Sequence, residues 1–551
     1  MEYRFAESET EMTESTKRPN VLIFCTDEQR ADHLGCMGHP VLKTPNIDRI
    51  AADGTLFRNC YSSSPACMPA RAGMFTGQAN RASGVRSNGV SLPEDVPTVP
   101  ALLAGAGYRT HSVGKLHLKT WGKPGGVDIT TIQTPEENPE RRIFWDKGLI
   151  TESPDNYYGF QTQDSAQGHV NYINGDYKTW LDKNHPGAFE GYACKDSEPK
   201  ALTIAPELHY NHWIADRAMD FIRAQAEKRG QEPFLAPGTC LTEKASDGQE
   251  KVPDPFSPQP FFLWCSFPDP HEPFAAVKKW SDVYEDVEVD LPRCTTELGE
   301  RSRSETMAAI GYGTEVQDPE YVTKCMRQTY GMISHVDEQV GRVLDCLEAA
   351  GLADNTVVMF VSDHGEQLGE HGMFYKGLYP YDGHSRVPFV VKVPWAGRKG
   401  KVVEDVVSML DIAPTVLDLA GVDQPEDKLM GPWWVERHGR PAPSLPGEVL
   451  TPVVVDGQRP QRGSALVEYD SDVPAAFDIV QMRMLVTNEY KLVYYAPTDE
   501  VMLFDRQRDP EEMTNLAGEA EYQPVVMELL KRLLHEICRT ENRRPRQICG
   551  A

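Results

Sequence analysis

The sequence predicts an α/β fold with a large, mostly parallel sheet between helices, followed by a smaller C-terminal α+β domain. Two short apolar runs, 20–26 and 356–362, each end at an aspartate. An amphipathic helix leads directly into the second run, which is the helix-to-strand alternation typical of parallel sheets. After a Pro- and Gly-rich stretch at 423–463, the pattern changes to short strands joined by tight turns.

Four apolar runs are predicted to be strands of the large sheet. They are NVLIFCT (20–26), PFFLWCS (260–266), TVVMFVS (356–362) and RVPFVVKV (386–393). Continuous apolar runs of this length are typical of strands buried on both faces. Ligands of such sheets bind at the carboxyl ends of the strands. Asp27 and the pair Asp363-His364 are expected to lie there.

One helix is predicted before the 356–362 strand. Its apolar residues repeat with a helical period and end near Gly351; they are Ile333, Val336, Val340, Leu344 and Leu347. This helix is expected to cover one face of the sheet.

The length of 551 residues exceeds what one core usually holds, so two units are expected. Residues 1–18 form a polar lead, and 19–425 form the large domain. Gly-, Pro- and charge-rich excursions at 119–200 and 230–258 interrupt that domain.

The C-terminal α+β domain is predicted at 426–551, with an antiparallel sheet. Strands are expected on both sides of a turn at Asn488-Glu489 within 482–495, and again at 500–504. A helix at 524–538 follows, with its apolar residues on one face.

The composition restricts the compartment and the partners. The net charge of −26 argues against nucleic acid and anionic membranes as partners. No apolar run approaches the roughly 20 residues that span a bilayer, and the N-terminus lacks the apolar core of a secretion signal. The twelve cysteines show no CxxC spacing. A cytoplasmic protein with mostly reduced cysteines is expected.

The stretch SSPACMPARAGMFTG (63–77) places a thiol before a helix. Pro69 suits the first turn of a helix, so Cys67 is expected at the N-terminus, where the helix dipole favours an anion. Arg71 lies one turn further and could pair with an oxyanion. The alternative is a structural cysteine that precedes a helix.

The surrounding motifs favour the functional interpretation. Cys67-Met68-Pro69-Ala70-Arg71 resembles the signature of type I sulfatases, in which the cysteine is oxidised to formylglycine. Other blocks resemble this family and follow its order: RPNVLIFCTDEQR, GVRSNG, SVGKLHL, FPDPHEPF, SDHGEQLGEHGMFYKG, RVPFVV, DIAPTVLDLAG and YKLVYY…LFDRQRDPEEMTNLA. The resemblance implies the α/β sandwich of the alkaline phosphatase superfamily, close to arylsulfatases and phosphonate monoester hydrolases.

The resemblance also implies a metal site and a set of catalytic residues. The metal ligands would be Asp27, Glu28, Asp363, His364 and the modified Cys67. Oxygen-rich ligation favours Ca²⁺, and Mg²⁺ or, through the imidazole, Mn²⁺ also fit. The catalytic set would be Cys67, Arg71, Lys115, His117, His271 and Lys376, with Asn88 and His384 on the substrate.

Three functions remain as alternatives. The first is hydrolysis of a small sulfate monoester through hydrated formylglycine, with His117 as the base and His271 or Lys376 as the proton donor. The second is hydrolysis of phosphonate monoesters or phosphodiesters at the same site. The third is a non-catalytic binding protein with unmodified Cys67. The first two require a maturation enzyme, and a homo-oligomer is compatible with the sequence.

Overall fold

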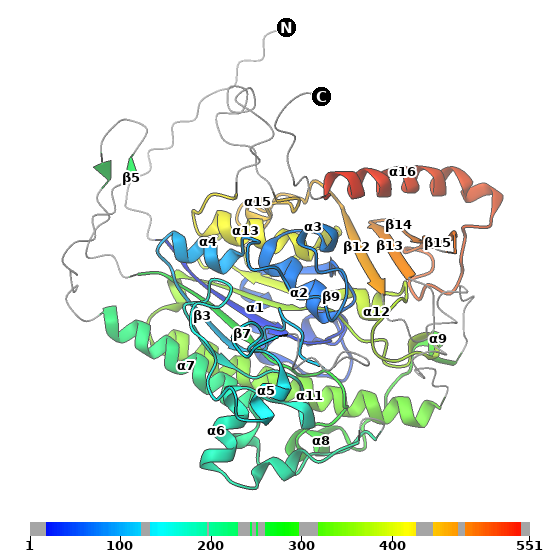
Figure 1. The fold of residues 1–551 in the computed structure, drawn as a ribbon. Helices are drawn as coiled ribbons and strands as arrows, with labels where there is room; N and C mark the ends of the chain where they lie inside the picture. The colour runs from blue at the N-terminus through cyan, green and yellow to red at the C-terminus, as the bar shows by residue number, and fades with distance from the viewer. Residues whose placement is uncertain are drawn as a thin grey trace.

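A nine-stranded sheet forms the centre of the molecule (Figure 1). The computed structural model describes residues 18–122, 133–195, 198–229, 243–244, 250–251, 259–296, 318–425, 445–471, 480–496 and 498–541. The strand order is β10-β2-β9-β8-β1-β7-β3-β4, and β11 also pairs with β2. The strands are β1 (Asn20–Thr26), β2 (Thr55–Tyr61), β3 (Arg109–Gly114), β4 (Thr162–Ser165), β7 (Phe261–Ser266), β8 (Thr356–Ser362), β9 (Arg386–Lys392), β10 (Lys401–Val403) and β11 (Val407–Ser408).

The sheet is mostly parallel, as predicted, and all four expected strands are present. β1 lies between β7 and β8 and is parallel to both. β9 is the difference, because it runs antiparallel to its neighbours β2 and β8. An apolar run carries no information about strand direction, so this reversal was not visible in the sequence.

Alternate residues of the central strands pack into two separate cores. Val21 and Ile23 of β1 face one core, and Leu22 and Phe24 face the other. The first core is covered by α2 (Cys67–Thr76), α4 (Val99–Gly105), α13 (Ile412–Leu419) and α15 (Thr451–Val454). The second is covered by α1 (Pro45–Asp53), α6 (Asp176–Asn184), α7 (Tyr210–Arg229) and α11 (Pro319–Ala349). This arrangement is the predicted sandwich (Figure 1).

Helix α11 confirms the predicted helix and extends it toward the N-terminus. The Asp318 side chain caps its start by accepting a hydrogen bond from the Glu320 N–H at 3.0 Å. It ends before Gly351, whose φ of 66° ends the helix with the left-handed conformation that glycine adopts easily. Helix α8 (Lys278–Tyr284) packs against it.

The 119–200 segment was predicted to be an excursion from the sheet, but it also supplies a strand of that sheet. This is the edge strand β4, which pairs in parallel with β3. It also contains α5 (Arg142–Asp146) and α6. The 230–258 segment lies outside the described residues except for the paired strands β5 (Glu243–Lys244) and β6 (Glu250–Lys251).

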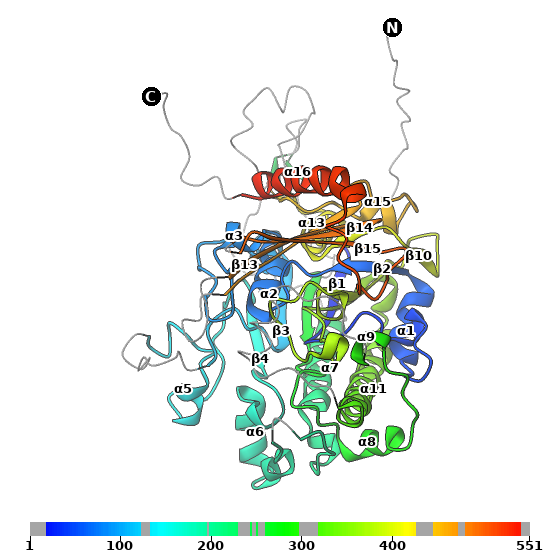
Figure 2. The same ribbon diagram turned by 90° about the vertical axis from the view of Figure 1, so that its right-hand side faces the viewer.

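A four-stranded antiparallel sheet forms the smaller C-terminal unit. Its strands, in order, are β12 (Ser464–Ser471), β13 (Val480–Thr487), β14 (Tyr490–Tyr495) and β15 (Glu500–Asp505). Helix α16 (Gln523–Arg539) lies across one face of this sheet and packs Val526, Leu529 and Leu533 against it (Figure 2). The hairpin, the third strand and the helix were predicted, whereas β12 was not.

The other face of the small sheet packs on the loop that joins β8 to β9. Leu378, Tyr379 and Tyr381 of this loop share a core with strands β12 to β15. The buried Lys491 of β14 donates to the Pro380 carbonyl at 3.0 Å, and the Tyr495 hydroxyl donates to the Leu378 carbonyl at 2.7 Å. The small sheet therefore supports a loop of the large domain.

The predicted boundary at 425/426 stays a prediction, because residues 426–444 lie outside the described chain.

The shorter helices are α3 (Asn80–Ser83), α9 (Arg293–Thr296) and α12 (Asp382–Ser385). Within the described residues, no helix is both long and apolar enough to cross a bilayer.

Candidate active site

Two carboxylates lie side by side at the carboxyl ends of the central strands. Asp27 follows β1 and Asp363 follows β8, and the last residues of these strands, Thr26 and Ser362, are register partners. Both aspartates are completely buried. Each is surrounded by donors; Asp363 Oδ1, for example, accepts from the His364 N–H at 2.8 Å. The parallel register therefore brings together carboxylates that are 336 positions apart in the chain.

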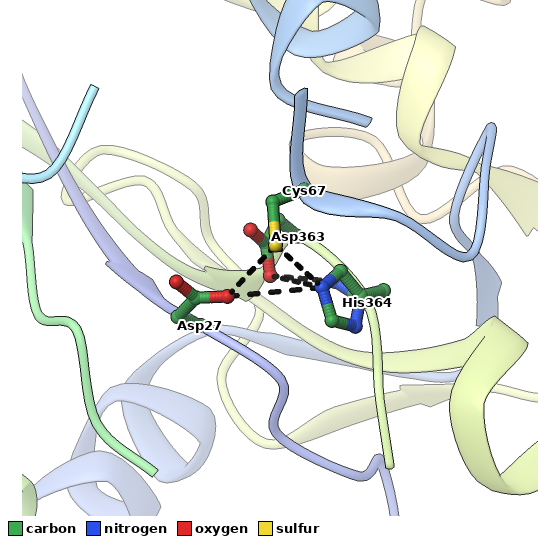
Figure 3. Close-up of side chains that lie close together, drawn as sticks. All are labelled: Asp27, Cys67, Asp363 and His364. Carbon is green, nitrogen blue, oxygen red and sulfur yellow. Dashed lines mark hydrogen bonds and ion pairs between the residues drawn. The ribbon is translucent and has the colours of Figure 1, made fainter. Parts of the chain in front are cut away.

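Cys67 is the first residue of α2, as predicted, and its side chain is buried against these carboxylates. Its Sγ lies 3.6 Å from Asp27 Oδ1 and 3.1 Å from His364 Nε2 (Figure 3). Burial and Asp27 raise the pKa of Cys67, but Lys376, Lys115 and His364 outweigh them and hold it well below its usual value. The thiol thus lies in an environment that stabilises an anion.

The tautomer of His364 is fixed by a backbone contact. Its Nδ1 lies 2.8 Å from the Gly365 carbonyl oxygen, which can only accept, so Nδ1 carries a proton. Burial lowers the pKa of His364, but Asp363 and Cys67 outweigh it and raise the pKa to about 9. When the ring is neutral, as a metal ligand must be, the lone pair is on Nε2, which points at Cys67 and the two aspartates (Figure 3). A backbone carbonyl commonly orients a metal-binding histidine in this way.

Asp27, Cys67, Asp363 and His364 form what we call the four-residue cluster. One donor atom from each residue lies within 4.8 Å of the others, and all four side chains are buried. Two carboxylates and one imidazole are donors that suit a divalent cation. The donor set therefore fits the metal that the resemblance implies.

Arg71 is completely buried, and two of its three nitrogens have protein partners. Its Nε donates to Asp363 Oδ2 at 2.7 Å. Its NH1 group donates to the Lys115 carbonyl at 2.9 Å and to Ser266 Oγ at 3.0 Å. Its NH2 group lies 3.8 Å from Asp27 Oδ2 and has no hydrogen-bond partner among the described residues. Arg71 therefore balances the charge of Asp363 and joins α2 to the ends of β3 and β7, and its pairing with a substrate oxyanion stays a prediction.

Lys115 and His117 follow β3 and reach the same centre. Lys115 Nζ forms an ion pair with Asp27. Burial raises the pKa of Asp27, but Lys115 and the other nearby cationic groups outweigh it and hold the pKa well below its usual value. His117 adopts a φ of 56°. Burial lowers its pKa to about 4, against the opposing effect of its hydrogen bond to Cys67. A neutral imidazole beside Cys67 has the protonation state that a general base needs.

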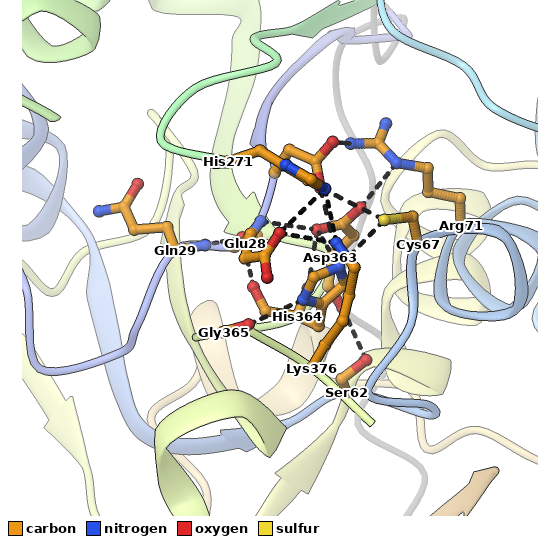
Figure 4. A network of polar contacts seen from close by, with 12 residues as sticks. Glu28, Gln29, Ser62, Cys67, Arg71, His271, Asp363, His364, Gly365 and Lys376 are labelled. Carbon is orange, nitrogen blue, oxygen red and sulfur yellow. Dashed lines mark hydrogen bonds and ion pairs between the residues drawn. The ribbon is translucent and has the colours of Figure 1, made fainter. Parts of the chain in front are cut away.

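His271, Lys376 and Glu28 form the second layer of the site. Lys376 Nζ lies 2.6 Å from both Glu28 Oε2 and His271 Nε2. His271 Nδ1 lies 2.7 Å from Glu272 Oε2. The structure thus places His271 and Lys376 side by side (Figure 4). Their place on the leaving-group side, which the resemblance implies, stays a prediction.

Glu28 was predicted to be a metal ligand, and it lies next to the four-residue cluster rather than in it. Its backbone takes a φ of 64°, and its carboxylate pairs with Lys376 and with His271, 3.0 Å away. Its donor atoms lie close to those of Asp27 and His271, a second group that could hold a cation. The role of Glu28 as a ligand therefore stays a prediction.

Asn88 and His384 were predicted to contact the substrate, and the structure gives both of them protein partners. Asn88 Oδ1 accepts from the Met68 N–H at 3.0 Å and so caps the start of α2. His384 is completely buried, with Nδ1 2.8 Å from Gln367 Nε2 and Nε2 3.3 Å from the Gly377 carbonyl. It therefore supports the loop that carries Lys376.

The sequence reasoning missed His169. Its ring stacks on His271 with 3.6 Å between ring centroids. It belongs to the 119–200 segment, where no motif or spacing distinguished it. His33 packs edge-on against His39 and Tyr330.

Comparisons with known proteins agree with this geometry. Residues 19–422 match the sulfatase family model, and residues 369–539 match a model described as N-sulphoglucosamine sulphohydrolase, C-terminal. An arylsulfatase of Clostridium perfringens is 26% identical, with 94% of each chain covered. An N-acetylglucosamine-6-O-sulfatase of Bacteroides thetaiotaomicron is also 26% identical, with 94% of this chain and 86% of the relative covered.

The fold likeness extends to solved structures. A phosphonate monoester hydrolase of Agrobacterium radiobacter superposes with a TM-score of 0.69 at 23% identity, covering 95% of this chain and 96% of that protein. Together with the family match over residues 19–422, these findings identify the chain as a sulfuric ester hydrolase that belongs to the sulfatase family of the alkaline phosphatase superfamily.

Proposed function

We propose that this protein hydrolyses a sulfate monoester to an alcohol and inorganic sulfate, with a nucleophile made from Cys67. The observation that carries the proposal is the position of the Cys67 side chain, which is buried at a helix N-terminus within the four-residue cluster. Oxidation of Cys67 to formylglycine would supply a hydrated aldehyde, whose oxygen is a nucleophile at sulfur and whose second hydroxyl allows sulfate to leave.

Asp27, Asp363 and His364 would hold a divalent cation, which supplies Lewis-acid polarisation of a sulfate oxygen when bound. Ca²⁺ is the first candidate from the resemblance. The imidazole Nε2 in the cluster makes Mn²⁺ its competitor, because nitrogen donors suit transition metals better than Ca²⁺.

The other residues bind the sulfate and transfer protons. The positive charges of Lys376 and Lys115 contribute to holding the pKa of Cys67 low, and they would stabilise the charge on the sulfate. His117 Nε2 would accept a proton at the Cys67 position, because its ring is neutral. Lys376 Nζ or His271 Nε2 would donate a proton to the departing alcohol oxygen.

The first test is the mass of the tryptic peptide 59–71 from protein produced in its native host. A mass that matches the aldehyde at Cys67 supports the proposal, and the mass of an intact cysteine contradicts it. The same protein is then assayed with 4-nitrophenyl sulfate after chelation and after addition of Ca²⁺ or Mn²⁺. We expect chelation to abolish turnover, and Cys67→Ala to lower kcat/KM by at least about 10⁴-fold.

A second candidate is the hydrolysis of phosphonate monoesters or phosphodiesters at the same site. The structural likeness to the phosphonate monoester hydrolase favours it. The ratio of kcat/KM for 4-nitrophenyl sulfate to that for 4-nitrophenyl phenylphosphonate decides between the two functions. A maturation enzyme for Cys67 is part of both proposals, whereas a cytoplasmic location and a homo-oligomer stay predictions.

A further inference from the structure

Three rings of the 119–200 segment extend the site beyond His271. Trp121, His169 and Tyr172, which we call the ring cluster, have centroids 6.1 to 6.5 Å apart. His169 joins them to the site, because its ring stacks on His271, the neighbour of Lys376. The ring cluster therefore begins next to His271 and Lys376, the two proton donors proposed above for the departing alcohol. All three side chains are partly exposed.

Polar atoms of this region lack partners among the described residues. Trp121 Nε1, His169 Nδ1 and Asn171 Oδ1 are shielded from solvent and make no hydrogen bond. Such atoms are costly to leave unpaired. They include a donor, the indole N–H, and an acceptor, the amide oxygen. Since the side chains are partly exposed, small rotations would present these atoms to a ligand.

A positive charge already occupies the faces of two of the rings. The Arg142 guanidinium carbon lies 5.7 Å from the Trp121 ring and 5.5 Å from the Tyr172 ring. Asp146 holds Arg142 in place, with Arg142 Nε 3.2 Å from Asp146 Oδ2. A cationic alcohol would have to compete with Arg142 for the ring faces, and the positive charge of Arg142 would repel it. The region therefore disfavours a cationic substrate.

We propose that the ring cluster and Asn171 bind the alcohol part of the substrate, and that this alcohol is polyhydroxylated, as in a sugar. A hydroxyl group both donates and accepts, so one sugar can pair with the indole N–H and with the amide oxygen. This assignment rests on the proposed function, because it names the ester that the site would cleave.

The test compares substrates in the holoenzyme. The probes are the 6-sulfates of N-acetylglucosamine, glucose and galactose, together with choline O-sulfate and 4-nitrophenyl sulfate. At least one sugar sulfate is expected to have a KM more than tenfold below that of choline O-sulfate. Trp121→Phe and Asn171→Ala should each lower the ratio of kcat/KM for that sugar sulfate to kcat/KM for 4-nitrophenyl sulfate by at least about tenfold.

Trp395→Phe is the matched control, because Trp395 is an exposed tryptophan outside the site, and it should leave the ratio unchanged. Arg142→Ala should lower the KM for choline O-sulfate. A KM for choline O-sulfate below that of every sugar sulfate would overturn the assignment. An unchanged ratio in both Trp121→Phe and Asn171→Ala would also overturn it.

A binding measurement separates this proposal from the proposed function. Calorimetry with the Cys67→Ala variant and the three sugar sulfates requires no turnover. If the wild type hydrolyses no sulfate ester but Trp121→Phe weakens sugar sulfate binding at least tenfold, the proposed function fails and the ring cluster assignment stands. If sulfate esters are hydrolysed and Trp121→Phe changes neither the binding nor the ratio, only the ring cluster assignment fails.

Discussion

The four-residue cluster and the ring cluster are built in opposite ways. The four-residue cluster lies at the ends of central parallel strands and at the start of a buried helix, and its polar groups are held by charged or backbone partners. The ring cluster lies on the connecting segment after β3, with partly exposed rings and with polar atoms that have no partner in the part of the chain that the structure describes. Chemistry that is common to a family needs the first kind of support, whereas substrate selection can use the second.

The loop that carries Lys376 lies between these extremes. It is a connection by sequence, but the small sheet packs against it and fixes its carbonyl groups through Lys491 and Tyr495. The C-terminal unit thus gives a loop residue some of the rigidity of a strand end. Three predictions test how firmly the fold holds each of these regions, from the largest expected effect to the smallest.

Asp363→Asn tests the four-residue cluster and should have the largest effect. It removes the partner of the completely buried Arg71 guanidinium, so we expect the free energy of unfolding to fall by about 3 kcal/mol. We also expect kcat/KM for 4-nitrophenyl sulfate to fall by at least about 10²-fold. Urea unfolding and steady-state kinetics measure the two effects. The exposed Asp418→Asn is the control, and an unchanged unfolding midpoint would contradict the assigned role of Arg71.

Lys491→Met tests whether the small sheet positions Lys376. The substitution leaves the half-buried carboxylate of Asp382 and the buried carboxylate of Glu512 without their ammonium partner. We expect a loss of about 2 kcal/mol of stability and a decrease of about tenfold in kcat/KM. The exposed Lys531→Met serves as the matched control. Loss of stability with full activity would show that the loop holds Lys376 without the small sheet.

Glu140→Gln tests the segment that leads to the ring cluster. Glu140 Oε1 accepts from the Leu118 and Lys119 N–H groups at 3.0 and 3.2 Å and from the Tyr157 hydroxyl at 2.7 Å. Burial, opposed by these hydrogen bonds, raises the pKa of Glu140 to about 7. The folded state therefore binds more protons than the unfolded state between the normal pKa of a glutamate and pH 7.

The contribution of Glu140 is complete at low pH and is lost as the pH rises through this window. Between pH 5 and 7, the free energy of unfolding of the wild type should therefore fall by about 2 kcal/mol more than that of Glu140→Gln. Thermal unfolding of both proteins across this range measures the difference, with the exposed Glu152→Gln as the control. Parallel stability curves for wild type and Glu140→Gln would show that Glu140 is ionised in the folded protein.

Much of the site followed from local sequence. Cys67 before Pro69 predicted a thiol at a helix start, and the apolar runs before Asp27 and Asp363 predicted carboxylates at strand ends. These predictions were correct because periodicity and helix starts are local properties of a few residues. The resemblance to sulfatases supplied the roles of Lys115, His117, His271 and Lys376, which their local sequences leave open.

The directions of side chains and strands were decided only by the tertiary structure. Arg71 pairs with Asp363, 292 positions away in the chain, and Glu28 pairs with Lys376, 348 positions away. His384 is buried beneath a loop by partners 17 and 7 positions away. No local sequence pattern encodes these choices. The reversal of β9 and the stacking of His169 on His271 have the same origin. The sequence by itself determined the kinds of chemical groups and the elements that carry them. Packing decided which groups meet, because burial leaves each charge only the partners that the whole fold brings within reach.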